Sequence, residues 1–272
     1  MKELKEKLFE SVQFLQKKIG KPEVAIVLGS GLGGLTESIE ESVRIPYSMI
    51  PNFPISTVKG HKGELVFGVL SGKKVVALEG RFHFYEGYSM KEITFPIRVL
   101  RLLGAEYLIV TNAAGGVNPL FKPGDLMIIV DHINLMPENP LRGPNDESLG
   151  PRFPSMHEAY SKKLVGLAQE VALKLGIKLS PGIYVALQGP NLETPSEYRM
   201  VRILGGDAVG MSTVPEVIVA NHMGMKVMGF SIITNIANPY DPKPTTHDEV
   251  VAVSRRAAKN LMLLVKELLR RL

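Results

Sequence analysis

The sequence contains no cysteine among its 272 residues. Disulfide bonds, thiolate metal sites and a cysteine nucleophile are therefore excluded. It also lacks any apolar run that approaches the roughly 20 residues of a membrane-spanning helix. Residues 1–20 space their leucines at helical intervals among lysines, without the unbroken apolar core of a signal peptide. These absences lead us to expect a cytoplasmic protein with no membrane partner.

Long basic stretches and paired histidines are absent as well. The formal net charge is +5, and the 32 lysines and arginines are spread along the chain. This charge suits small anionic ligands and gives little support to nucleic-acid binding, but an ordinary solvated surface is the favoured explanation. No two histidines stand at the spacing of a metal site. We therefore expect neither a metal nor a nucleic-acid partner.

Short apolar runs alternate with helical patterns along the chain. The strand candidates lie in residues 23–34, 64–80 (two strands joined at Ser71 and Gly72), 106–117, 125–135, 182–190, 208–212 and 226–234. The helical patterns cover residues 2–19, 91–103, 157–176, 195–205, 214–223 and 247–271. This alternation predicts an α/β fold with a mostly parallel or mixed sheet. No linker is apparent, so we expect residues 1–272 to form a single domain.

Polar residues and glycines recur where the predicted strands end. They include Ser30, Thr111–Asn112, Gly210–Ser212 and Thr234–Asn235. Ligands of α/β sheets bind outside the carboxyl ends of the strands. We therefore expect these groups to form one site.

The loop Gly29–Gly34 matches the G-x-G-x-x-G pattern of dinucleotide-binding proteins. The acidic residue expected about 20 positions later is missing, because that region reads YSMIPNFP. The dinucleotide interpretation is therefore disfavoured. Exposed backbone N–H groups and the Ser30 hydroxyl can still hold a phosphate, although a plain tight turn also accounts for the loop.

The segment GRFHFYEG, residues 80–87, combines cations with aromatic rings. If it is extended, Arg81 and His83 share one face, while Phe82 and Phe84 point the other way into the core. A planar guanidinium matches a pair of phosphate oxygens. We expect Glu86 to orient a neighbouring phosphate donor such as His83.

Two further segments carry anion-binding features. His61 lies in a glycine-flanked turn, and Ser212 with Thr213 precedes a helix that opens with proline. Simple helix capping explains Ser212 and Thr213 equally well. We expect structural roles for the remaining histidines, His132, His157 and His222, apart from His247.

Eight segments in order carry a family resemblance: GSGLG, GRFHFYEG, TNAAGGVNP, DHINL, NPLRGPND, GPNLET, DAVGMSTVPE and ITN. From about residue 20 to the carboxyl terminus the chain closely resembles the trimeric purine nucleoside phosphorylases. These enzymes cleave purine (2′-deoxy)ribonucleosides with orthophosphate, giving the free base and α-(deoxy)ribose 1-phosphate. The resemblance implies a mixed, partly barrel-like sheet flanked by helices, a homotrimer, and no cofactor beyond the co-substrate orthophosphate.

The resemblance also implies the residues of the site. The phosphate site is implied to comprise Ser30, His61, Arg81, His83, the Ala113 backbone and Ser212. The ribose contacts are implied to be Tyr85, Met211 and His247, and the base contacts Ala114, Gly115, Leu192, Glu193, Val209, Gly210 and Asn235. Phe153 is implied to reach into a neighbouring subunit's site. Catalytic roles fall to His83, Glu193 and Asn235. The alternative to a ribose contact at His247 is that this segment only caps the last helix, through Thr246 or Asp248.

The residue types favour 6-oxopurines. A Glu193 carboxylate can accept N1–H of hypoxanthine or guanine, whereas adenine presents a bare acceptor there. The related methylthioadenosine phosphorylases typically carry Asp in place of Asn235. Leu192 replaces an aromatic residue common in the family, so base stacking should be looser. We expect inosine and guanosine as substrates, with a nucleoside hydrolase or a non-catalytic anion-binding module as alternatives.

Overall fold

The computed structural model describes residues 2–57, 62–236 and 246–272. The strands are β1 (Val24–Leu28), β2 (Glu40–Pro46), β3 (Glu64–Leu70), β4 (Lys73–Glu79), β5 (Tyr107–Gly116), β6 (Leu126–Asn134), β7 (Leu179–Ala186), β8 (Ala208–Gly210) and β9 (Lys226–Ile236). The α-helices are α1 (Lys2–Gln16), α2 (Met90–Leu103), α3 (Lys162–Lys174), α4 (Pro195–Ile203), α5 (Val214–His222) and α6 (His247–Leu269).

The strands form one mixed sheet in the order β2-β3-β4-β1-β5-β8-β7-β6-β9. An additional pairing between β5 and β9 closes the last five strands into a barrel. Parallel pairs (β1 with β4 and β5) stand beside antiparallel ones (β3 with β2 and β4). The predicted α/β fold with a mixed, partly barrel-like sheet is confirmed.

Strand β5 is the junction between the open and closed parts of the sheet. Its first residues, Tyr107–Val110, pair with β1, and its last two, Gly115 and Gly116, pair with β8. Along its whole length it also pairs with β9. The end of β5 therefore turns from the open sheet into the barrel, and this is where the cavity described below lies.

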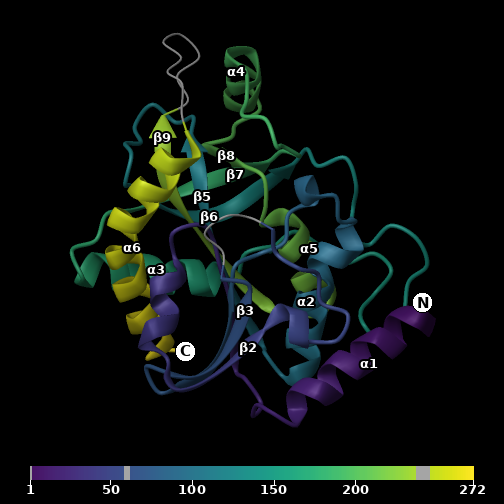
Figure 1. Ribbon diagram of the computed structural model, residues 1–272. Helices are drawn as coiled ribbons and strands as arrows, with labels where there is room; N and C mark the ends of the chain where they lie inside the picture. The colour runs from purple at the N-terminus through teal and green to yellow at the C-terminus, as the bar shows by residue number, and fades with distance from the viewer. Residues whose placement is uncertain (1, 58–61, 237–245) are drawn as a thin grey trace.

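Helices cover both faces of the sheet. Strand β1 is buried throughout and alternates its side chains between two cores. Ala25 and Val27 join the core under α1, α2 and α5, whereas Ile26 joins the core under α3 and α6. Figure 1 shows these two helix groups on opposite sides of the sheet, with α4 at the top. Within the described ranges, no helix is both long and apolar enough to span a membrane.

The strands and helices expected from the sequence are confirmed. The structure adds strand β2, which the sequence did not predict. The predicted hairpin is present, and Ser71 and Gly72 turn it with φ values of 52° and 82°. Strand β2 escaped prediction because its side chains are mostly exposed and its register shifts between Glu40 and Val43. Neither alternation nor an apolar run marks such an edge strand.

Three local features of the structure refine the expectations from the sequence. The Gly-rich loop leads into a short 3₁₀ helix, Gly33–Ser38, and then into β2, so the helix of a dinucleotide fold is absent there. Phe84–Glu86 also forms a 3₁₀ turn, so GRFHFYEG is extended only as far as His83. Strand β5 continues past Asn112 to Gly116, within the predicted range 106–117, and β9 pairs with it over that length.

Gly68 in β3 packs closely against the start of β2, where the register shifts. A Cβ there would overlap the backbone oxygen of Glu40 and lie 2.6 Å from Cγ2 of Ile39. We expect Gly68→Ala to lower the free energy of unfolding by about 1–3 kcal/mol, as overpacked positions do. Urea denaturation followed by circular dichroism measures it.

Gly166→Ala is the matched control. A Cβ at Gly166, inside α3, would meet no atom within 4 Å. Alanine should stabilise this helix by about 0.5–1 kcal/mol because glycine loses more backbone entropy on folding. Equal effects of the two substitutions would contradict the packing assigned to Gly68.

Candidate active site

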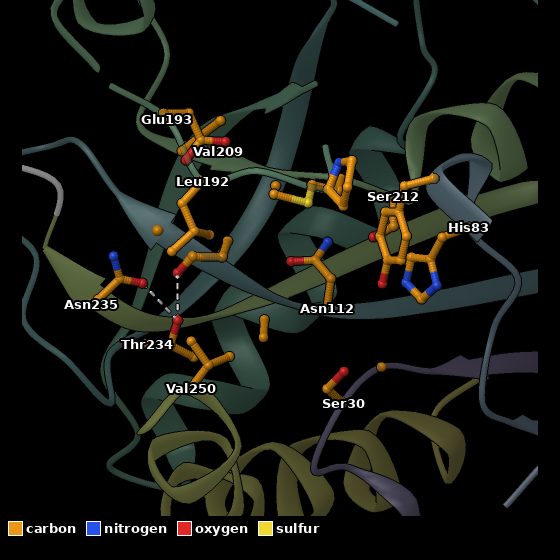
Figure 2. A pocket seen from close by; sticks show the side chains of 18 of the residues that line it. Ser30, His83, Asn112, Leu192, Glu193, Val209, Ser212, Thr234, Asn235 and Val250 are labelled. Atoms are coloured by element: carbon orange, nitrogen blue, oxygen red, sulfur yellow. Dashed lines mark hydrogen bonds between the residues drawn. The ribbon is translucent and has the colours of Figure 1, made fainter. Parts of the chain in front are cut away.

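A cavity of about 570 Å³ opens where β1, β5 and β9 end and β8 enters the barrel. Its lining includes these sequence-predicted residues: Ser30, Arg81, His83, Tyr85, Ala113, Ala114, Gly115, Leu192, Glu193, Val209, Gly210, Met211, Ser212 and Asn235. Figure 2 shows Ser30, His83 and Ser212 toward one end and Glu193 and Asn235 toward the other, with Asn112 between them. The strand-end polar groups therefore meet in one site, as expected.

Arg81 is fixed by a buried ion pair. Its Nε and Nη2 donate to the two carboxylate oxygens of Glu216, at 3.2 and 2.7 Å, and its Nη1 donates to the Thr111 carbonyl at 2.7 Å. The side chains of Arg81 and Glu216 are only 2% and 7% exposed. The guanidinium is therefore held in one orientation at the wall of the cavity.

His83 is held by Glu86, as the sequence led us to expect. Glu86 Oε1 accepts from the backbone N–H of His83 at 2.7 Å and lies 3.0 Å from its Nδ1. Burial alone would raise the pKa of Glu86, but hydrogen bonds from His83 and Thr57 lower it to about 2. Burial also lowers the pKa of His83. In a neutral His83, Nδ1–H donates to Glu86, and Nε2 is left as an acceptor that faces away from that carboxylate.

Tyr85 stacks on His83, with ring centroids 4.6 Å apart and an interplanar angle of 16°. Burial raises the pKa of Tyr85 to about 12, so its hydroxyl keeps its proton. Phe82 lies on the other side of the chain, buried against Tyr47 and Tyr88. The division of this segment into a site face and a core face is confirmed for residues 81–83.

Glycine brings the first loop close to β5. Gly29 donates its N–H to the Thr111 hydroxyl at 3.1 Å, and a Cβ at Gly29 would lie 2.8 Å from the Thr111 carbonyl oxygen. A larger residue at position 29 would not let this loop and strand β5 approach each other so closely. Ser30, the next residue, is thereby placed at the cavity wall.

The opposite end of the cavity presents the carboxyl group of Glu193 and the side-chain amide of Asn235. Burial raises the pKa of Glu193, while a hydrogen bond from the Tyr198 hydroxyl acts in the other direction. The Thr234 hydroxyl donates to Asn235 Oδ1 at 3.0 Å and lies 3.3 Å from the Ala114 carbonyl (Figure 2). With Oδ1 engaged, Asn235 offers its Nδ2–H groups to a ligand.

Among the predicted residues whose side chains the structure describes, Phe153 is the one outside the cavity lining. His61 lies outside the described residues, and of His247 the structure describes only its place at the start of α6. Phe153 is 87% exposed and lies on the surface. Thr246 caps α6 by accepting the N–H of Glu249 at 3.3 Å, so the capping alternative is confirmed for that residue.

The other histidines are engaged elsewhere or exposed. His132 packs edge-on against Tyr160, and His222 is buried between Arg98 and Asn145. His157 is exposed. Across the described part of the chain, no three His, Asp or Glu side chains gather as metal ligands do.

Several lining residues escaped prediction. They include Thr57, Tyr198 and Val250. The Thr194-x-x-Glu197 capping box marks the start of α4 and could have located Tyr198 one turn into that helix. Asn112 and Thr234 were expected at the site as strand-end polar residues, but the sequence assigned neither of them a role.

A family model described as "Phosphorylase superfamily" matches residues 23–270. Purine nucleoside phosphorylase 1 of Geobacillus stearothermophilus is 56% identical over 262 residues, which cover 96% of each chain. The chain belongs to the purine nucleoside phosphorylase family.

A mammalian relative and a solved structure agree with this membership. Purine nucleoside phosphorylase of Mus musculus is 53% identical over 91% of this chain and 88% of its own. The crystal structure of the Schistosoma mansoni purine nucleoside phosphorylase in complex with inosine superposes with a TM-score of 0.93. That protein is 42% identical, and the match covers 98% of this chain and 96% of that one.

Tyr198 allows a test of the electrostatics around Glu193. Tyr198→Phe removes the hydroxyl that stabilises the Glu193 carboxylate. The pKa of Glu193, already raised by burial, should rise further, so the carboxyl group should take up its proton at a higher pH. A carbon-13 NMR titration of the glutamate carboxyl groups measures this, with the signal assigned through Glu193→Gln. Tyr107→Phe, at the far end of β5, should leave that titration unchanged. A Tyr198→Phe curve identical to the wild-type curve would contradict the contact.

Proposed function

We propose that the protein catalyses the reversible phosphorolysis of 6-oxopurine (deoxy)ribonucleosides. Orthophosphate attacks the sugar, and the products are the free purine and α-(deoxy)ribose 1-phosphate. Orthophosphate is a co-substrate, and we propose no cofactor. The observation that carries this proposal is one cavity with an anion-binding end and a purine-recognising end.

The anion-binding end combines polar groups of several kinds. The Arg81 guanidinium, the His83 ring and the Ser212 hydroxyl converge there from three separate segments, together with Ser30 and the Ala113 backbone. Guanidinium N–H groups and hydroxyl groups donate to phosphate oxygens, and Nε2 of a neutral His83 accepts the proton of a hydrogen phosphate. We assign this end to orthophosphate, and we retain His61 as a further proposed ligand.

The purine-recognising end discriminates between bases. Glu193 as a carboxylate accepts N1–H of hypoxanthine or guanine, and Asn235 donates its amide to N7. Adenine would place an N1 acceptor against the Glu193 carboxylate, leaving buried polar groups unpaired. This pairing favours inosine and guanosine. Matching solved structures are Schistosoma purine nucleoside phosphorylases in complex with inosine, hypoxanthine, guanosine and, in one structure, adenosine.

The arrangement suits cleavage of the glycosidic bond. Positive charge develops on the sugar and negative charge on the departing purine. Phosphate beside the sugar stabilises the first, and the Asn235 amide stabilises the second. We assign the sugar to the space between the two ends, against Tyr85 and Met211, with His247 as a proposed contact.

A trimer is part of the proposal. Phe153 is an aromatic side chain that is 87% exposed in the single chain. It lies in residues 137–156, a long segment without helix or strand. Insertion of Phe153 into a neighbouring subunit's cavity would bury it over the nucleoside. We propose that three chains exchange this residue around a ring.

Phosphate dependence tests the proposed function. Inosine, guanosine, adenosine and methylthioadenosine are each incubated with the protein, with and without orthophosphate, and base release is followed by chromatography. We expect rapid release from inosine and guanosine only when phosphate is present, and much slower release from the other two. Ribose 1-phosphate should form in equal amount to the base.

Two outcomes would overturn the assignment. Base release at the same rate without phosphate would indicate a nucleoside hydrolase. Binding of inosine without any release would indicate a non-catalytic module. Glu193→Gln is the control for base recognition, because it keeps the side-chain volume and should lower inosine cleavage while reducing the discrimination against adenosine.

A further inference from the structure

A strained turn lies beside the proposed phosphate site. Thr213, which is 1% exposed, has φ 72° and ψ −54°. The N–H of Val214 donates to the Ser212 carbonyl at 2.8 Å, which closes a three-residue γ-turn around Thr213. A β-branched residue at positive φ is a rare and unfavourable conformation. Such strain persists only where the surrounding contacts hold it, and it is concentrated at functional sites.

The hydroxyl of Thr213 joins two other side chains. It accepts a hydrogen bond from Asn112 Nδ2 at 2.9 Å, and its Oγ1 lies 3.1 Å from Ser212 Oγ. The Asn112 bond is buried and joins β5 to the turn that precedes α5. The result is a chain of three polar groups that ends at Ser212 on the cavity wall.

The first member of this chain sets the direction of the others. An amide Nδ2 is a donor only, so Thr213 Oγ1 must accept from it. The Thr213 hydroxyl then has a single proton to donate, and Ser212 Oγ is the acceptor within reach among the described residues. If Ser212 donated to Thr213 instead, the buried Thr213 proton would lose that acceptor, at a desolvation cost.

We propose that Asn112 and Thr213 are positioning residues that make Ser212 a dedicated donor to phosphate. The proton of Thr213 occupies a lone pair of Ser212 Oγ, so the proton of Ser212 points into the cavity. Successive hydrogen bonds in one direction also polarise one another, which strengthens the last donor. The strained turn brings the Thr213 hydroxyl between its two neighbours. This inference rests on the proposed function, because it takes phosphate as the ligand of Ser212.

Thr213→Val is the direct test. Valine keeps the β-branched shape and removes the hydroxyl. We expect the KM for orthophosphate to rise about tenfold, the effect of weakening one hydrogen bond to a charged ligand. The KM for inosine should change little, and Thr213→Ser should restore the wild-type value for phosphate. Thermal unfolding of each variant is measured in parallel.

Thr213→Gly separates strain from hydrogen bonding. Glycine adopts positive φ readily, so this variant should unfold at a temperature no lower than that of Thr213→Val. It still lacks the hydroxyl, and the KM for phosphate should rise by the same factor. Weakened phosphate binding in a protein relieved of strain would exclude a purely structural role for Thr213.

A double-mutant cycle with Ser212→Ala completes the test. If Thr213 acts through Ser212, Thr213→Val should change the KM for phosphate less than about twofold once Ser212 is absent. An equal rise in both backgrounds, or a wild-type KM in Thr213→Val, would overturn the inference. A different result would overturn the proposed function, namely base release by the wild-type protein without phosphate.

Discussion

The buried ion pair between Arg81 and Glu216 is the interaction on which the site depends. Arg81 follows β4, Glu216 lies in the first turn of α5, and the third contact of the guanidinium is the Thr111 carbonyl of β5. Both charges are removed from water, so losing one partner would leave the other uncompensated, at a cost of about 3–5 kcal/mol. The pair therefore joins three elements and fixes the guanidinium at the cavity wall.

The rest of the cavity is positioned relative to the same elements. Helix α5 is preceded directly by the Ser212–Thr213 turn, so the contact that holds the helix also holds the proposed phosphate donors. Strand β5 supplies Asn112 to that turn and, a few residues later, pairs with β8 and β9 at the purine-recognising end. Strand β5 thus sets the distance between the two ends of the cavity. A reaction in which phosphate attacks the sugar while the base departs requires such a fixed distance.

The sequence predicted most elements because their signals are local. Continuous apolar runs marked the buried strands, and helical spacing marked the helices, whereas the exposed and irregular β2 carried neither signal. Family resemblance supplied most of the cavity lining. Sequence could not predict the contacts that orient it, because Arg81 lies 135 positions from Glu216 and Asn112 lies 101 from Thr213. The roles of His61, His247 and Phe153 stay predictions.

The affinity of Glu216→Gln for orthophosphate tests the central claim most directly. Glutamine keeps the shape of the side chain but removes the charge that orients Arg81. Circular dichroism first shows that the variant is folded, and isothermal titration calorimetry then measures its Kd for phosphate. This Kd should be at least about tenfold above that of the wild type, because a charge-assisted bidentate pair fixes the Arg81 guanidinium more firmly than a neutral amide does. A folded Glu216→Gln that binds phosphate with wild-type affinity would contradict the role of this ion pair.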